Sequence, residues 1–139
     1  MPKYDPQAKG AFMGLTMEHT RAHAVRSILE AVACMLKQNL QYLKLDCKEI
    51  RSMGGGAGSP LWCQIKADLT GTELVTLKNK ETACLGSAIL AGVGVGVYPS
   101  VEAACARTVA LDRRYTPSGA DYSACYENYN KAEERVLQK

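Results

Sequence analysis

Residues 48–70 read KEIRSMGGGAGSPLWCQIKADLT, and this stretch decides how the rest of the chain is interpreted. Polar and apolar residues alternate over 48–53, which predicts a short strand. Four glycines in five positions follow, and they predict a tight loop. Ser59 is a favourable helix N-cap, and Pro60 suits the first position of a helix. The segment therefore predicts a strand, a glycine-rich loop and a helix in direct succession.

Helices and strands alternate on either side of this unit. Apolar residues recur every three or four positions between Thr20 and Leu45, which predicts a helix of about six turns. Residues 73–77 read ELVTL and predict a second strand. Strands joined through a helix are expected to be parallel neighbours. The remaining helices are predicted over 60–69, 80–91, 101–109 and 121–139.

This order predicts an α/β fold with two parallel strands and four to five helices. Two strands alone form a marginal sheet with open edges. The chain should therefore need strands that its own sequence does not contain, and the low aromatic content of 6% agrees with an incomplete core.

Composition excludes several classes of protein. The 139 residues suit one domain, and 47% hydrophobic with 22% charged residues is an ordinary globular balance. The net charge of +3 is spread along the chain, so we expect no nucleic-acid binding. Glycines interrupt the longest apolar stretch, 83–98, so no membrane helix is expected. The chain opens without a secretory signal, and no two of its six cysteines are closer than 13 residues. We therefore expect reduced thiols and a cytoplasmic location.

The glycine loop is the main candidate site on chemical grounds. Glycines let a ligand approach the backbone closely, and the start of the next helix can attract an anion. This chemistry fits a nucleotide, although a purely structural turn remains the alternative. The second glycine run, 92–96, follows a helix and is interpreted as a close-packed helix exit. His19 and His23 lie four residues apart with Glu18 beside them, but the sequence has no other His and no Cys pair nearby to complete a site, so we predict no metal site.

Three motifs in order resemble one known family. Residues 10–30, which contain GAFMGL, His23 and SILE, closely resemble the second signature of the FGGY carbohydrate kinases. Residues 53–68 resemble the adenosine loop of that family and the helix after it, and residues 81–91 resemble its next helix. Within the family, GGGAGSPLW, Tyr4-Asp5-Pro6 and GVGVY at 94–98 look most like bacterial xylulose kinases.

The resemblance implies a partial ribonuclease-H-like, actin-like ATPase domain. Residues 1–139 would form the C-terminal part of the second such domain of a sugar kinase. The full domain has a five-stranded sheet, so three strands would be missing here. The catalytic Asp and the sugar-binding residues of the family lie upstream, so the resemblance implies no catalytic residue and no metal ligand in this chain.

The implied function is the adenosine-binding part of an ATP-dependent sugar kinase of the xylulose kinase type. The complete enzyme would use ATP and Mg²⁺ to phosphorylate a sugar hydroxyl, and this chain alone should be inactive. The expected nucleotide-binding residues are Gly54, Gly55, Gly56, Ala57, Ser59 and Pro60. The alternative is a non-catalytic nucleotide-binding or assembly module, which self-associates or pairs with a separate N-terminal chain.

Overall fold

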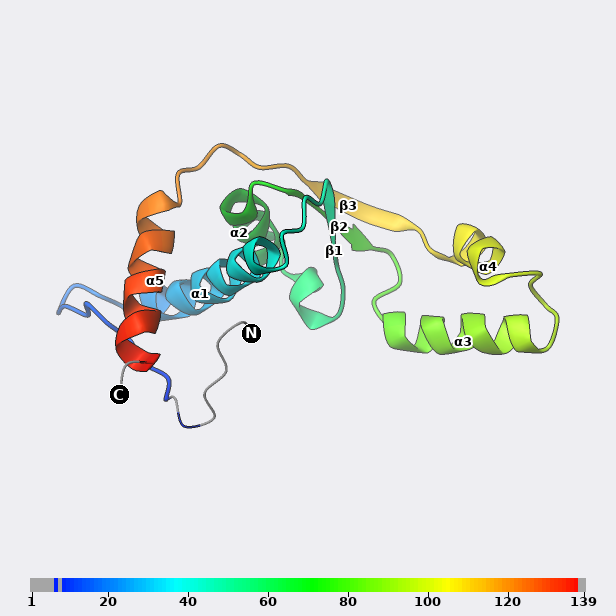
Figure 1. Cartoon of the computed structure of the whole chain (residues 1–139), viewed down its shortest axis with the longest axis horizontal. Helices are drawn as coiled ribbons and strands as arrows, with labels where there is room; N and C mark the ends of the chain where they lie inside the picture. Colours follow the sequence, from blue (N-terminus) through cyan, green and yellow to red (C-terminus); the bar gives the residue numbers. More distant parts are fainter. Residues whose placement is uncertain (1–6, 8, 138–139) are drawn as a thin grey trace.

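The computed structural model describes residue 7 and residues 9–137, and within these the chain forms five α-helices, one 3₁₀ helix and three strands (Figure 1). The α/β prediction is confirmed. In chain order the elements are α1 (Arg21–Tyr42), β1 (Glu49–Ser52), η1 (Gly55–Gly58), α2 (Pro60–Thr70), β2 (Glu73–Leu77), α3 (Thr82–Gly94), α4 (Val101–Thr108), β3 (Leu111–Tyr115) and α5 (Ser123–Leu137).

The sheet has the order β1-β2-β3. β1 and β2 are parallel, with Ile50 opposite Leu74, which confirms the predicted parallel pair. β3 pairs antiparallel with β2 on its other side. The prediction of only two strands is therefore wrong, because β2 is central and β3 covers the edge that was expected to be open.

β3 escaped prediction because its sequence, LDRRY, lacks a buried apolar face, and four of its five residues are exposed. Its pairing is supported by charge instead. Glu49 and Glu73 lie opposite each other in the parallel register. The Arg114 guanidinium from β3 forms ion pairs with both carboxylates. One cation thus joins all three strands and offsets the repulsion between two like charges.

α2 forms the middle layer of the fold because it is buried on two opposite faces. Cys63 and Ala67, one helical turn apart, pack toward Leu74 of the sheet. Ile65 and Leu69 pack toward α1 on the other side. Residues two positions apart on a helix point about 200° apart, so these two pairs face opposite ways.

α1 covers the outer face of α2 through small residues, since Ala33 and Cys34 are fully buried there. Thr20 is the N-cap residue of the helix. The helix ends at Tyr42 rather than Leu45, and Lys44 turns the chain toward β1 with a φ of 50°. α5 lies across α1 (Figure 1). Tyr126 and Tyr129 of α5 pack against the core, together with Tyr122, which directly precedes the helix.

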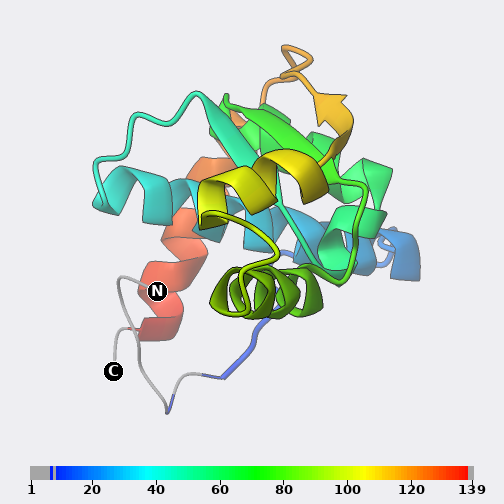
Figure 2. The same ribbon diagram turned by 90° about the vertical axis from the view of Figure 1, so that its right-hand side faces the viewer.

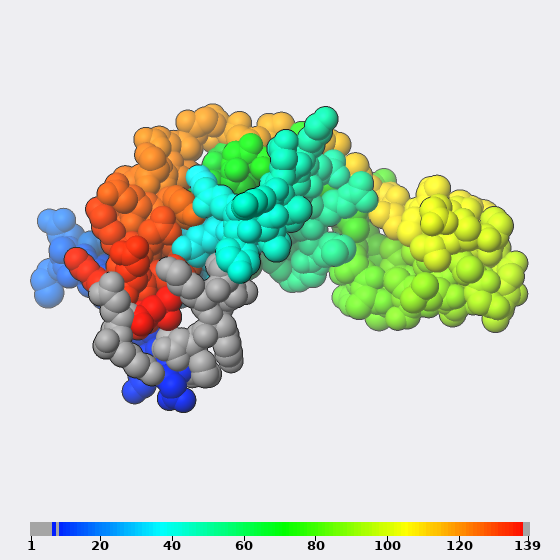
Figure 3. Space-filling view, in the orientation of Figure 1, coloured from blue at the N-terminus to red at the C-terminus, as the bar shows by residue number. Residues whose placement is uncertain are grey.

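α3 and α4 pack on each other and project from one end of the molecule as a separate lobe (Figures 1 and 3). Figure 2, which looks onto that end, shows the two helices in front of the sheet. The turn after α3 confirms the predicted close-packed helix exit. The Gly92 carbonyl accepts from the N–H of Val97 at 2.8 Å, and a Cβ on Gly92 would lie 2.8 Å from the Tyr98 ring.

Candidate functional site

The glycine loop connects the end of β1 to the start of α2, as predicted. Gly54 begins it with φ 71° and ψ −165°, a conformation that only glycine adopts readily. Residues 55–58 then form the 3₁₀ turn η1, and the Ala57 N–H donates to the Gly54 carbonyl at 3.0 Å. The loop is therefore a defined turn. A residue with a side chain at position 54 would strain its backbone.

Ser59 and Pro60 start α2, and both are used structurally. The Ser59 Oγ accepts from the N–H of Trp62 at 3.3 Å, and its carbonyl accepts from Cys63 at 3.0 Å. Pro60 has no N–H to offer. The Ser59 cap and the proline at the first helical position therefore leave few free N–H groups at this helix start. The arrangement suits the neutral part of a nucleotide better than its phosphates.

Gly56 packs directly against the only tryptophan of the chain. A Cβ at Gly56 would lie 2.9 Å from the Cζ3 atom of Trp62, closer than real Cβ contacts come. The Trp62 Nε1–H donates to the Leu29 carbonyl of α1 at 3.0 Å. Trp62 thus ties the glycine loop to α1, a role that the sequence pattern did not reveal because it depends on how the loop folds back.

Lys66 supports the other side of this ring. Its ammonium lies 4.5 Å from the centre of the Trp62 ring and donates to the Ser52 Oγ at 3.2 Å. Partial burial lowers the pKa of the Lys66 ammonium. The lysine therefore links α2 to the end of β1, where the loop begins.

Gly55 and Gly58 face outward, since nothing lies within 4 Å of a Cβ added at either position. Beside them is a small hollow of about 20 Å³, room for about one water molecule. Gly54, Ala57 and Gly58 line it, whereas Gly55 and Gly56 do not. A nucleoside would therefore lie against this surface rather than inside a pocket.

Polar groups from the three strands and from the loop after β2 surround the hollow: Ser52, Thr76, Asn79, Lys80 and Asp112. Asn79 lies just before the helix predicted over 80–91. Its Oδ1 does accept from the Glu81 N–H at 2.9 Å, although the helix itself begins later, at Thr82. Asp112 was missed because β3 was missed. These groups could hydrogen-bond a ribose or a base edge placed over the loop.

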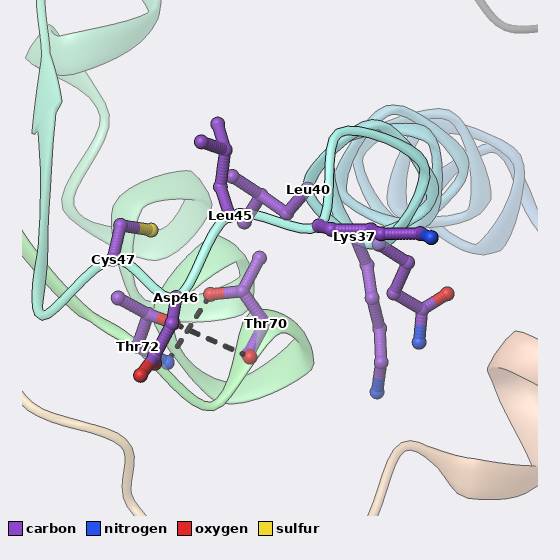
Figure 4. Close-up of a pocket in the computed structure, with 9 residues that line it drawn as sticks. Lys37, Leu40, Leu45, Asp46, Cys47, Thr70 and Thr72 are labelled. Carbon is purple, nitrogen blue, oxygen red and sulfur yellow. Dashed lines mark hydrogen bonds between the residues drawn. The ribbon is translucent and has the colours of Figure 1, made fainter.

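A larger cleft of about 370 Å³ lies at the opposite end of β1 and α2 (Figure 4). Its lining includes Lys37, Lys44 and Asp46, so its charges are mixed. The hydroxyls of Thr70 and Thr72 are turned to backbone groups of their own turn. We assign no ligand to this cleft.

His23 caps the start of α1, and His19 makes the equivalent bond in the turn before that helix. The Nδ1 atom of His19 accepts from the Thr16 N–H at 3.0 Å, and that of His23 accepts from the Thr20 N–H at 3.1 Å. Over residue 7 and residues 9–137, no three His, Cys, Asp or Glu side chains gather in an arrangement that could hold a metal ion. The same residues contain no helix long and apolar enough to span a bilayer.

Comparisons with known proteins all point to the same family. Residues 1–95 match the FGGY family of carbohydrate kinases, C-terminal domain. Glycerol kinase of Dechloromonas aromatica (strain RCB) is 39% identical over 142 residues, covering 98% of this chain and 28% of the relative. Xylulose kinase of Staphylococcus epidermidis (strain ATCC 12228 / FDA PCI 1200) is 28% identical over 141 residues, covering 99% and 28%.

Solved structures agree. Plasmodium falciparum glycerol kinase with ADP aligns with a TM-score of 0.80 at 26% identity, covering 99% of this chain and 29% of that chain. Ligand-bound xylulose kinase from Lactobacillus acidophilus aligns with a TM-score of 0.82 at 22% identity, covering 98% and 29%. The Tyr4-Asp5-Pro6 motif lies outside the described residues. The chain spans less than a third of the length of these relatives, and it belongs to the FGGY family of carbohydrate kinases, whose C-terminal domain it matches.

Proposed function

We propose that residues 1–139 form the C-terminal part of the second actin-like domain of an ATP-dependent sugar kinase and bind the adenosine of ATP. The observation that carries the proposal is the open backbone at Gly55 and Gly58, beside a ring of polar groups. The related glycerol kinase structure with ADP supports it. ATP would supply the γ-phosphoryl group, and this chain would orient the nucleoside.

The donor groups fit the nucleoside and leave the metal to other parts of the enzyme. Ser52, Asn79 and Asp112 offer donors and acceptors beside the loop, whereas the described residues form no metal-binding cluster. In the complete enzyme, Mg²⁺ would bind together with the phosphates of ATP. The catalytic base and the sugar site belong to the upstream part, so this chain alone should not catalyse.

For the substrate, we propose a sugar of the xylulose class, on the strength of the GGGAGSPLW loop. Glycerol is the second candidate, because the glycerol kinase relative reaches the higher identity of 39%. Phosphorylation assays on the gene product that includes the upstream part would separate the two. Preference for xylulose over glycerol supports the first choice, and the reverse supports the second.

The adenosine proposal is tested by calorimetric titration of the 139-residue chain with ADP. Gly55→Val adds bulk to the outward face of the loop, where no protein atom lies within 4 Å. It should weaken ADP binding at least tenfold while leaving the thermal midpoint unchanged. Ala124→Val on the exposed side of α5 is the matched control and should bind as the parent does. Equal ADP affinity in Gly55→Val and the parent would contradict the proposal.

A second function, assembly through self-association or through a separate N-terminal chain, is favoured by the apolar surface of the α3–α4 lobe. Leu90 is 64% exposed and Val95 78%. We propose a cytoplasmic location for either form of the protein because of the cysteine pattern of the sequence, in which no two cysteines are closer than 13 residues.

A further inference from the structure

Two of the six thiols lie together although 91 positions separate them in sequence. Cys34 is fully buried in the middle of α1, and Cys125 is half-buried near the start of α5. Cys125 packs against the core cluster that contains Cys34. The two side chains therefore belong to one packed contact between α1 and α5. The other four cysteines lie on other elements or in loops.

A carboxylate holds this pair in place. The Cys125 thiol donates to the Glu30 Oε2 at 3.8 Å, and Glu30 lies one helical turn before Cys34 on α1. The Arg26 guanidinium binds the other oxygen of Glu30 at 2.6 Å and also donates to the Tyr122 hydroxyl at 2.6 Å. Glu30 and Arg26 of α1 thus make polar contacts with Cys125 and Tyr122 beside the two sulfur atoms.

We propose that Cys34 and Cys125 are a redox pair that forms a reversible disulfide and fastens α5 to α1. The bond would link the two ends of the segment that contains β1, the glycine loop, α2, the α3–α4 lobe and β3. This inference is independent of the proposed nucleotide binding.

The reaction needs a disulfide oxidant, for which oxidised glutathione serves. The Cys125 thiolate, the more accessible of the two, attacks one glutathione sulfur, and a glutathione thiolate leaves. The Cys34 thiolate then attacks the Cys125 sulfur of the mixed disulfide and releases the second glutathione. The protein loses two protons and two electrons, and one glutathione disulfide is reduced to two thiols.

Formation should be slow in the folded protein. Burial raises the pKa of the Cys34 thiol to about 12, and burial with the nearby Glu30 carboxylate raises the pKa of the Cys125 thiol. Few thiolates exist at neutral pH, so the rate should increase with pH up to at least pH 9. Cys84 is exposed and should react before the pair does. Its only product should be a mixed disulfide with glutathione.

The test is peptide mapping of the native chain after incubation with oxidised glutathione at pH 8.5. Trypsin should yield residues 27–37 linked to residues 115–131, a linkage that reductant removes. Cys125→Ser keeps a donor for Glu30 and should abolish the linkage, whereas Cys84→Ser, the matched control at an exposed site, should retain it. The oxidised parent should melt about 5–15 °C above the reduced parent, with no such shift in Cys125→Ser.

The proposal is overturned if Cys84 becomes fully modified while peptides 27–37 and 115–131 stay unlinked. It is equally overturned if either cysteine links to a different one. Oxidation of the chain unfolded in urea is the control for the activity of the reagent. Several cysteine pairings should form at random under those conditions.

Discussion

α2 and α3 are helices of similar length, 11 and 13 residues, and both are rich in apolar side chains, but they are buried very differently. α2 has four buried residues, two facing the sheet and two facing α1. α3 buries only Ile89, although it is the more apolar of the two. An apolar helix is expected to be buried against other parts of the protein. In this chain α2 is buried in that way, whereas most of α3 stays exposed.

The difference leads to a prediction about assembly, and this is the largest effect we expect. The lobe and the free edge of β1 leave apolar side chains and backbone groups without cover in the described chain. The 139-residue chain should therefore sediment as a dimer or larger at low micromolar concentration. Leu90→Lys should shift the distribution toward monomer. A compact monomer that unfolds cooperatively would instead indicate that the chain is self-sufficient.

A matched pair of core truncations should show the contrast in stability. Ile65→Ala removes a side chain that is 1% exposed between α2 and α1, and should cost about 2–5 kcal/mol of unfolding free energy. Leu90→Ala on α3 should change it by less than about 0.5 kcal/mol. Urea denaturation measured on a monomeric background compares them directly. Similar losses in both variants would mean that the lobe is packed as firmly as the body.

The glycine loop allows a smaller test inside the body. Gly56→Ala forces the Trp62 ring to move and should cost about 1–3 kcal/mol. Gly55→Ala meets open space and should leave the unfolding free energy nearly unchanged. The fluorescence of Trp62 should change only in Gly56→Ala. If both variants behaved alike, the contact between Gly56 and Trp62 would not be important for the loop.

Two serine caps provide the finest comparison. Ser59 caps α2 at 3.3 Å and Ser100 caps α4 at 3.2 Å, each accepting from the third helical N–H. Ser59→Ala should lower global stability by about 1 kcal/mol. Ser100→Ala should mainly speed local hydrogen exchange in α4, since the lobe contributes little to the global transition. Equal changes in global stability would contradict this view of the lobe.

Local signals made much of the fold predictable. Thr20, Ser59 and Ser100 start their helices as their side chains suggest, and Gly71 ends α2 in the left-handed conformation. β3 was not predictable, because LDRRY is stabilised by pairing with β2 and by Arg114 rather than by an apolar pattern.

The sequence predicted where the glycine loop lies, but it did not predict which residues around the loop form its surface. The glycines marked its position, yet the roles of the individual positions depend on geometry. Gly56 makes room for Trp62, and Asp112 reaches the hollow from a strand far along the chain. Contacts of this kind come from the folded arrangement and leave no periodic trace in the sequence.

The most direct test of the central claim is to locate ADP on the chain by following backbone amide signals in an NMR titration. We predict saturable shifts that concentrate at residues 54–58, Asn79 and Asp112, with the α5 signals unchanged. Shifts that centre on the cleft near Lys37 and Thr72, or the absence of any saturable shift at millimolar ADP, would contradict the assignment of the glycine loop as the adenosine site.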